Sequence, residues 1–122
     1  MTAENRISNR HVFQSRIVIR LRRNGQSISV GGWARDLSES GLSAFVAEPL
    51  EAGELVTLQI PLLTSGKELI PAKVTRCLGT EYGFEFTALS SAQRRSVRAT
   101  LAGQPAIPHW TLSHRSHEKN KK

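Results

Sequence analysis

The sequence predicts an all-β fold, a six-stranded antiparallel β-barrel with one C-terminal α-helix. Six short segments carry apolar residues at every second position, as strands with one buried face do. These segments recur at spacings of about 8 to 12 residues and are separated by glycine, asparagine and proline, which is typical of barrels and sandwiches. A chain of 122 residues is long enough for one such domain and too short for two.

The first two strands are predicted to form a hairpin. The first begins at Arg16 and places three apolar residues on one face: Ile17, Ile19 and Leu21. Asn24-Gly25 tolerates the positive φ angles of a tight turn, so the chain is expected to return as a second strand through Arg35. Within that return, Gly31-Gly32 indicates a β-bulge.

Four more strands and a helix complete the predicted domain. The strands are Leu42–Val46, Leu55–Leu62, Ala72–Leu78 and Tyr82–Thr87, and three aromatic residues of the last share a face: Tyr82, Phe84 and Phe86. Ser90 and Gln93 form a capping-box signature. Because Val97 and Leu101 are an apolar pair one turn apart, a helix is expected from Ser91 to Ala102.

Charge divides the chain into three parts. Residues 1–35 carry seven arginines and one glutamate, residues 36–92 eight acids and three bases, and residues 93–122 seven bases and one glutamate. We expect a flexible basic arm at 1–15, the barrel and helix at 16–103, and a flexible basic tail at 104–122. No segment has the roughly 20 apolar residues of a membrane span or a secretory signal's apolar core, so a cytoplasmic location is expected.

The turn between the second and third predicted strands has the most chemical content. Asp36-x-Ser38-x-x-Gly41 places a carboxylate, a hydroxyl and a glycine close together. Asp36 can accept hydrogen bonds from the Watson–Crick edge of guanine, Ser38 can donate to or accept from a ligand, and Gly41 permits close backbone approach. The same residues are common in ordinary turns, where Asp and Ser cap the turn and Gly adopts a left-handed conformation. Taken alone, this motif fits either interpretation.

A second candidate is the pair Arg6 and Arg10, which precedes the first predicted strand. Guanidinium groups suit a nucleotide because each can bind a phosphate through two hydrogen bonds or stack on guanine. The same spacing recurs at Arg16/Arg20 and Arg94/Arg98, but those pairs share a strand face and a helix face, which explains them as solvent-exposed residues.

Taken together, these motifs resemble the PilZ domain family. The resemblance runs from Arg6 to Leu101 and rests on the N-terminal Arg-x-x-x-Arg, the Asp-x-Ser-x-x-Gly-Leu run, the strand Tyr82–Phe86 and the helix after it. It implies a split-barrel fold and a receptor that binds cyclic di-GMP, usually as an intercalated dimer, on the outside of the barrel. At the position before the first motif arginine, where many members have a basic residue, this chain has Asn5.

The resemblance also implies roles for the motif residues. Arg6 and Arg10 are expected to clamp phosphates and guanine faces, while Asp36, Ser38 and Gly41 read guanine from the barrel. Binding is then expected to order the arm and to change a surface for an unidentified effector protein in motility, exopolysaccharide secretion or biofilm formation. Two other functions stay open: a ligand-free adaptor, and a nucleic-acid-binding barrel, for which few aromatic residues remain outside the core.

Weaker signals have ordinary structural explanations. Trp33 can stack on a base, but a tryptophan beside two glycines more often covers a packing gap. Cys77, the single cysteine, is expected to be a small buried thiol. No metal site or cofactor is predicted, because three histidines of the tail lack further ligands: His109, His114 and His117. No enzyme activity is predicted either, because no catalytic arrangement is recognisable.

Overall fold

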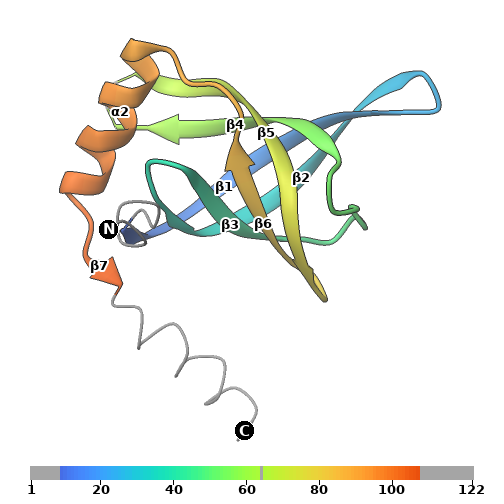
Figure 1. The fold of residues 1–122 in the computed structure, drawn as a ribbon, viewed down its shortest axis with the longest axis horizontal. Helices are drawn as coiled ribbons and strands as arrows, with labels where there is room; N and C mark the ends of the chain where they lie inside the picture. Colours follow the sequence, from blue (N-terminus) through green and yellow to red (C-terminus); the bar gives the residue numbers. More distant parts are fainter. Residues whose placement is uncertain (1–8, 64, 108–122) are drawn as a thin grey trace, which may run out of the picture.

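A closed six-stranded antiparallel barrel with one helix makes up the fold (Figure 1). The computed structural model describes residues 9–63 and 65–107. Its barrel strands are β1 Arg10–Arg23, β2 Gln26–Leu37, β3 Gly41–Val46, β4 Leu55–Leu62, β5 Gly66–Leu78 and β6 Glu81–Phe86. They pair in the order β2-β3-β6-β5-β4-β1, and β1 also pairs with β2, so the sheet closes on itself. The predicted barrel is confirmed.

The interior of the barrel is filled by aliphatic side chains from alternate strand positions. On β1 these are the three predicted residues, and Ile17 and Ile19 are 1% and 0% exposed. Each such side chain contributes about 1.5–3 kcal/mol when it leaves water. The helix α2 (Ser91–Ala102) buries Val97 and Leu101 against this core, and its predicted capping box is present. Among the described residues, no helix is long and apolar enough to cross a membrane.

The β1–β2 hairpin turns where the sequence predicts, but it contains no bulge at the paired glycines. Asn24 and Gly25 have φ angles of 54° and 76°, which confirms the tight turn. The ladder runs without interruption past Gly31 and Gly32, so the predicted bulge is wrong. A Cβ at Gly32 would lie 2.9 Å from Cδ1 of Ile19, so core packing accounts for this glycine.

Both ends of the domain are more ordered than the sequence suggests. Strand β1 begins at Arg10, six residues before the predicted start, because its first residues pair with β2 and with a short strand β7, Ala106–Ile107. The N–H of Val12 donates to the carbonyl of Pro105 at 2.9 Å. The flexible arm predicted at 1–15 is therefore wrong for 10–15, and the tail predicted from residue 104 is wrong for 104–107. The rest of that tail, and residues 1–8, lie outside the described residues.

Three register shifts that the sequence does not reveal interrupt the sheet, one of them on β1 between Val12 and Ser15. Arg35 is an extra residue of β2 between the pairs Ala34↔Ala44 and Asp36↔Ser43. Thr75 is likewise extra on β5, between Val74↔Phe84 and Arg76↔Gly83. An extra residue reverses the alternation beyond it, so side chains that would face the core are turned outward.

The bulge at Thr75 affects the cysteine. Strand β5 starts at Gly66, six residues before the predicted Ala72, and continues past Thr75 to Leu78. Cys77 lies in this last part, opposite Tyr82, and is exposed. The prediction of a buried thiol is wrong, because the run of β5 beyond the bulge extends past the packed interior.

Candidate functional site

Asp36 occupies the outer face of the barrel at the end of β2. Ala34 and Leu37 on either side of it belong to the core. Because Arg35 is an extra residue between them, Ala34 and Leu37 can both face inward while Asp36 faces outward. Asp36 pairs with Ser43, which faces away from the core because the flanking Leu42 and Ala44 face into it. The Asp36 side chain is nevertheless only 2% exposed.

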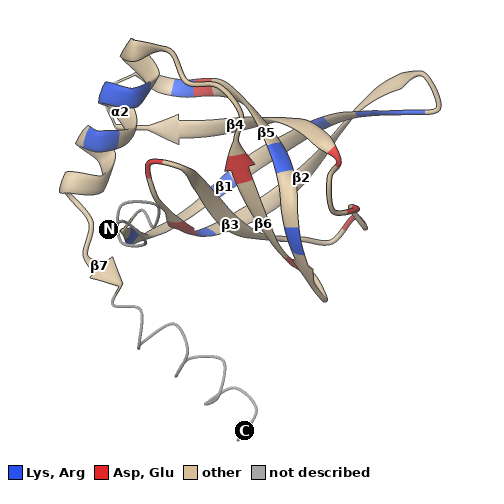
Figure 2. Ribbon diagram, in the orientation of Figure 1, with Lys and Arg blue, Asp and Glu red and all other residues tan. Residues whose placement is uncertain are grey.

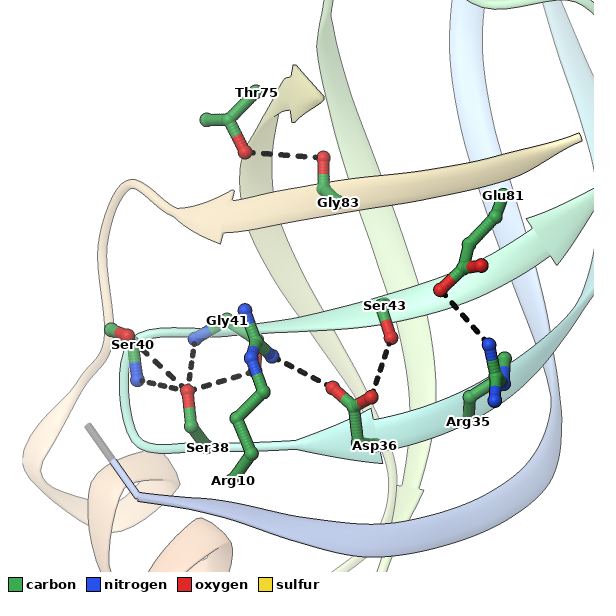
Figure 3. A network of polar contacts seen from close by, with 10 residues as sticks. All are labelled: Arg10, Arg35, Asp36, Ser38, Ser40, Gly41, Ser43, Thr75, Glu81 and Gly83. Atoms are coloured by element: carbon green, nitrogen blue, oxygen red, sulfur yellow. Dashed lines mark hydrogen bonds and ion pairs between the residues drawn. The ribbon is translucent and has the colours of Figure 1, made fainter. Parts of the chain in front are cut away.

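A buried carboxylate requires partners, and Asp36 receives them from two strands. Nη1 of Arg10 donates to Oδ1 of Asp36 at 2.8 Å, and the hydroxyl of Ser43 donates to Oδ2 at 2.8 Å (Figure 3). The arginine is the accessible member, since its side chain is 28% exposed. This contact joins two sequence motifs that lie 26 residues apart.

Ser38 and Gly41 shape the turn that follows Asp36. The Ser38 hydroxyl accepts hydrogen bonds from the N–H groups of Ser40 and Gly41, each at 3.2 Å, and the Ser38 N–H donates to the Gly41 carbonyl at 2.8 Å (Figure 3). Gly41 does not have the left-handed φ that an ordinary turn glycine would use. Instead, a Cβ there would lie 2.0 Å from the carbonyl oxygen of Phe84. Glycine is required because β6 passes directly beside it.

The bulge that positions Asp36 is itself held by side-chain contacts. The Arg35 guanidinium lies 5.0 Å from the centre of the Phe45 ring, and its Nη1 lies 3.1 Å from a carboxylate oxygen of Glu81. These contacts reach from β2 across β3 to β6, and they fix the conformation of the extra residue. The outer surface is therefore preorganised around Asp36.

A family model for the PilZ domain matches residues 4–103. The chain belongs to the PilZ domain family. The match spans both motifs and the helix, in agreement with the resemblance seen in the sequence. A comparison with curated protein sequences finds no match.

Solved PilZ domains share this barrel. The PilZ domain of CeSA from a cellulose-synthesizing bacterium aligns with a TM-score of 0.60 at 22% identity, over 79% of this chain and 97% of that one. The PilZ domain with c-di-GMP of YcgR from Escherichia coli aligns with a TM-score of 0.58 at 16% identity, over 93% of this chain and 95% of that one. At these identities the likeness shows a common fold.

The structure brings most of the predicted site residues of this PilZ domain together. Arg10 contacts Asp36, and Ser38 and Gly41 are hydrogen-bonded to each other in the turn directly after Asp36, whereas Arg6 falls outside the described residues (Figure 3). Ser43 also contacts Asp36, and sequence reasoning missed it. The available signal was its place on a short strand, two residues after Gly41. Residues two apart on a strand lie on the same face, so Ser43 shares the face of this motif glycine.

Trp33 lies on β2 beside these residues, with Arg16 and Phe45 as its cross-strand neighbours. It is 47% exposed. Gly32 faces the core, on the side of β2 opposite Trp33, so both expectations for Trp33, stacking on a base and covering a packing gap, stay predictions. Within 9–63 and 65–107, no cluster of His, Cys, Asp and Glu could hold a metal ion.

Proposed function

We propose that this PilZ domain is a receptor for cyclic di-GMP. The observation that carries the proposal is the Arg10–Asp36 contact, which places an accessible arginine over a preorganised polar surface on the outside of the barrel. Membership of a family of binding domains supports it, as does the solved relative whose structure contains c-di-GMP.

The residues of the site divide into a ligand-gripping part and a supporting part. A guanidinium has five N–H donors, and Arg10 uses one of them toward Asp36 among the described residues, so the others can serve a phosphate or a guanine. Arg6 is proposed as the second arginine. Asp36 orients Arg10 and accepts from guanine, while Ser38 and Gly41 contribute through the turn that holds Asp36 in place.

Charge favours the approach of such a ligand. The chain has a formal charge of +7, and Figure 2 shows blue segments on β1, β5 and α2 of the described part. Cyclic di-GMP carries two phosphate groups, so a basic surface raises its local concentration and its rate of association. Base-stacking nucleic-acid binding is less well supported, because Tyr82 and Phe84 are 5% and 2% exposed and face the core.

The domain is proposed to act as a switch without enzyme activity. Ligand bound between the N-terminal arginines and the barrel alters the surface near β2 and β3, and an effector protein reads that change. The processes proposed are motility, exopolysaccharide secretion or biofilm formation, and the location proposed is the cytoplasm.

Isothermal titration with cyclic di-GMP tests the proposal, with GMP and cyclic di-AMP as controls. Saturable binding is expected for cyclic di-GMP alone, with two ligands per domain if it binds as an intercalated dimer. Arg10→Ala is expected to weaken binding about 100-fold, because it removes charge-assisted hydrogen bonds of about 1.5–3 kcal/mol each. Absence of heat at high micromolar ligand would overturn the receptor proposal and favour the ligand-free adaptor.

A further inference from the structure

A second arginine lies on the same outer surface, on the far side of the site from Arg10. The register of three neighbouring ladders places Asp36 opposite Ser43, Ser43 opposite Gly83, and Gly83 opposite Arg76. Strands lie about 4.8 Å apart, so this row extends about 14 Å across the barrel from β2 to β5. Arg76 therefore ends a row that begins at the Asp36 carboxylate.

Bulges at both ends of the row place these side chains on one face. Without the extra residue Arg35, the alternation of β2 would turn Asp36 toward the core, and without Thr75 the alternation of β5 would do the same to Arg76. Thr75 is anchored by its hydroxyl, which donates to the Gly83 carbonyl at 3.3 Å (Figure 3). Bulges beside binding sites commonly serve to redirect a side chain in this way.

Gly83 leaves the middle of the row open. A Cβ built there would lie 3.4 Å from the Cβ of Arg76 and 3.8 Å from its Nε. Because Nε lies near the end of the side chain, this distance shows that the arginine leans over Gly83. A larger side chain at position 83 would compete with Arg76 for this space.

Among the described residues, no carboxylate lies within ion-pair distance of Arg76. In the part of the chain that the structure describes, the ion pairs involve Arg10, Arg23, Arg35 and Arg98, and none includes Arg76. Arg76 is exposed, on a strand that Figure 2 shows with basic segments. An uncompensated guanidinium beside a glycine floor is suited to an anionic group of a ligand.

We propose that Arg76 binds a phosphate group of the nucleotide ligand and that Gly83 provides the space in which its guanidinium lies. The site then holds the ligand between Arg10 at one end of the row and Arg76 at the other. Neither Arg76 nor Gly83 belongs to the two motifs that the sequence singles out around Arg6 and Asp36. This inference rests on the proposed function.

Titration of Arg76→Gln with cyclic di-GMP tests the inference against Arg95→Gln, which removes the same charge from an exposed position of α2. Arg76→Gln is expected to weaken binding about 10- to 100-fold, the range that one charge-assisted hydrogen bond corresponds to. Arg95→Gln is expected to bind like the wild type. If wild-type protein does not bind, the proposed function fails; if Arg76→Gln binds like wild type, only this inference fails.

Two further variants sharpen the assignment. Arg76→Lys is expected to retain most of the affinity, since an ammonium still meets a phosphate as a point charge, whereas a loss as large as that of Arg76→Gln would overturn the phosphate assignment. Gly83→Val is expected to weaken binding in the wild type but to add little in the Arg76→Gln background. Fully additive losses would contradict the shared role. Thermal unfolding of each variant checks that the barrel is intact.

Discussion

The two ends of β1 each carry an arginine that pairs with a carboxylate, and the two pairs are built differently. At the hairpin end, Arg23 donates to both oxygens of Glu54 at 3.0 Å, lies 3.5 Å from Glu48, and donates to the carbonyl of Pro49 at 2.9 Å. At the other end, Arg10 makes one contact of 2.8 Å with Asp36. Arg23 thus makes three hydrogen bonds and a further ion pair with protein groups, whereas most donors of Arg10 are unused by the described residues.

Burial differs as well. Glu54 is 18% exposed, and its hydrogen bond with Arg23 lowers the pKa of the carboxyl below its usual value. Asp36 is 2% exposed and shares its charge between Arg10 and the hydroxyl of Ser43. The first pair fixes the loop before β4, whereas the second leaves most donors of Arg10 unused by the described residues, as the proposed ligand site requires.

The largest expected difference between the two ends is in ligand binding. Asp36→Asn removes the charge that orients Arg10, and we expect cyclic di-GMP affinity to fall about 100-fold, since buried charge-assisted contacts are worth about 1.5–3 kcal/mol each. Glu54→Gln is the matched variant at the other end and is expected to leave affinity unchanged. Isothermal titration of both proteins measures the difference. Equal losses would show that the two pairs do not differ in function.

A smaller difference is expected from the serines. Ser43→Ala leaves Oδ2 of Asp36 without the hydrogen bond it receives at 2.8 Å, in a buried position. We expect a loss of about 1–2 kcal/mol in the free energy of unfolding and roughly tenfold weaker cyclic di-GMP binding. Ser27→Ala removes an exposed hydroxyl that accepts from Arg22 near the hairpin turn, and it should change neither quantity appreciably.

Ser43→Thr separates positioning from mere packing. Threonine keeps the hydroxyl and suits a strand, so it is expected to restore most of the affinity lost in Ser43→Ala. Denaturant unfolding and titration are measured on the same preparations. Restored stability without restored affinity would contradict the view that Ser43 acts through the Asp36 carboxylate.

The sequence predicts the barrel because its information is local and repeated. Period-two alternation places Ile17 and Ile19 inside, Asn24-Gly25 sets the hairpin, and Ser90 begins the helix. It also predicts that Arg10 and Asp36 meet, because the intervening residues form one strand and its return. These features depend on residues close together in the chain.

What the sequence does not predict depends on contacts between distant segments. Strand β7 exists because residues 106–107 pair with residues 10–11, almost the whole chain away. The bulges at Arg35 and Thr75 carry no glycine to mark them, and the glycine pair that suggested a bulge serves core packing instead. Since a bulge decides which face each later residue occupies, the roles of Ser43 and Arg76 could not be read from alternation alone.

The smallest expected effect concerns pH at the hairpin end. Because the pKa of Glu54 is lowered by its hydrogen bond with Arg23, the folded protein holds this carboxylate ionised at a pH where the unfolded chain, with a pKa of about 4.3, takes up a proton. The pair therefore stabilises the fold above about pH 4.3, and this contribution is lost as the pH falls through the lower folded value. Since both side chains are partly exposed, solvent screening keeps this contribution small.

Urea unfolding of wild type and Glu54→Gln between pH 7 and pH 3 measures this effect. The wild type is expected to be the more stable at pH 7, and the difference should shrink as the pH falls below about 4.3. In an Arg23→Met background the carboxylate has lost the main donor that lowers its pKa and keeps only the Glu51 N–H, so Glu54→Gln should change the pH dependence less than it does in the wild type. A difference between wild type and Glu54→Gln that stays constant over the whole range would show that Glu54 stabilises the loop by hydrogen bonding alone, without a change in its proton affinity on folding.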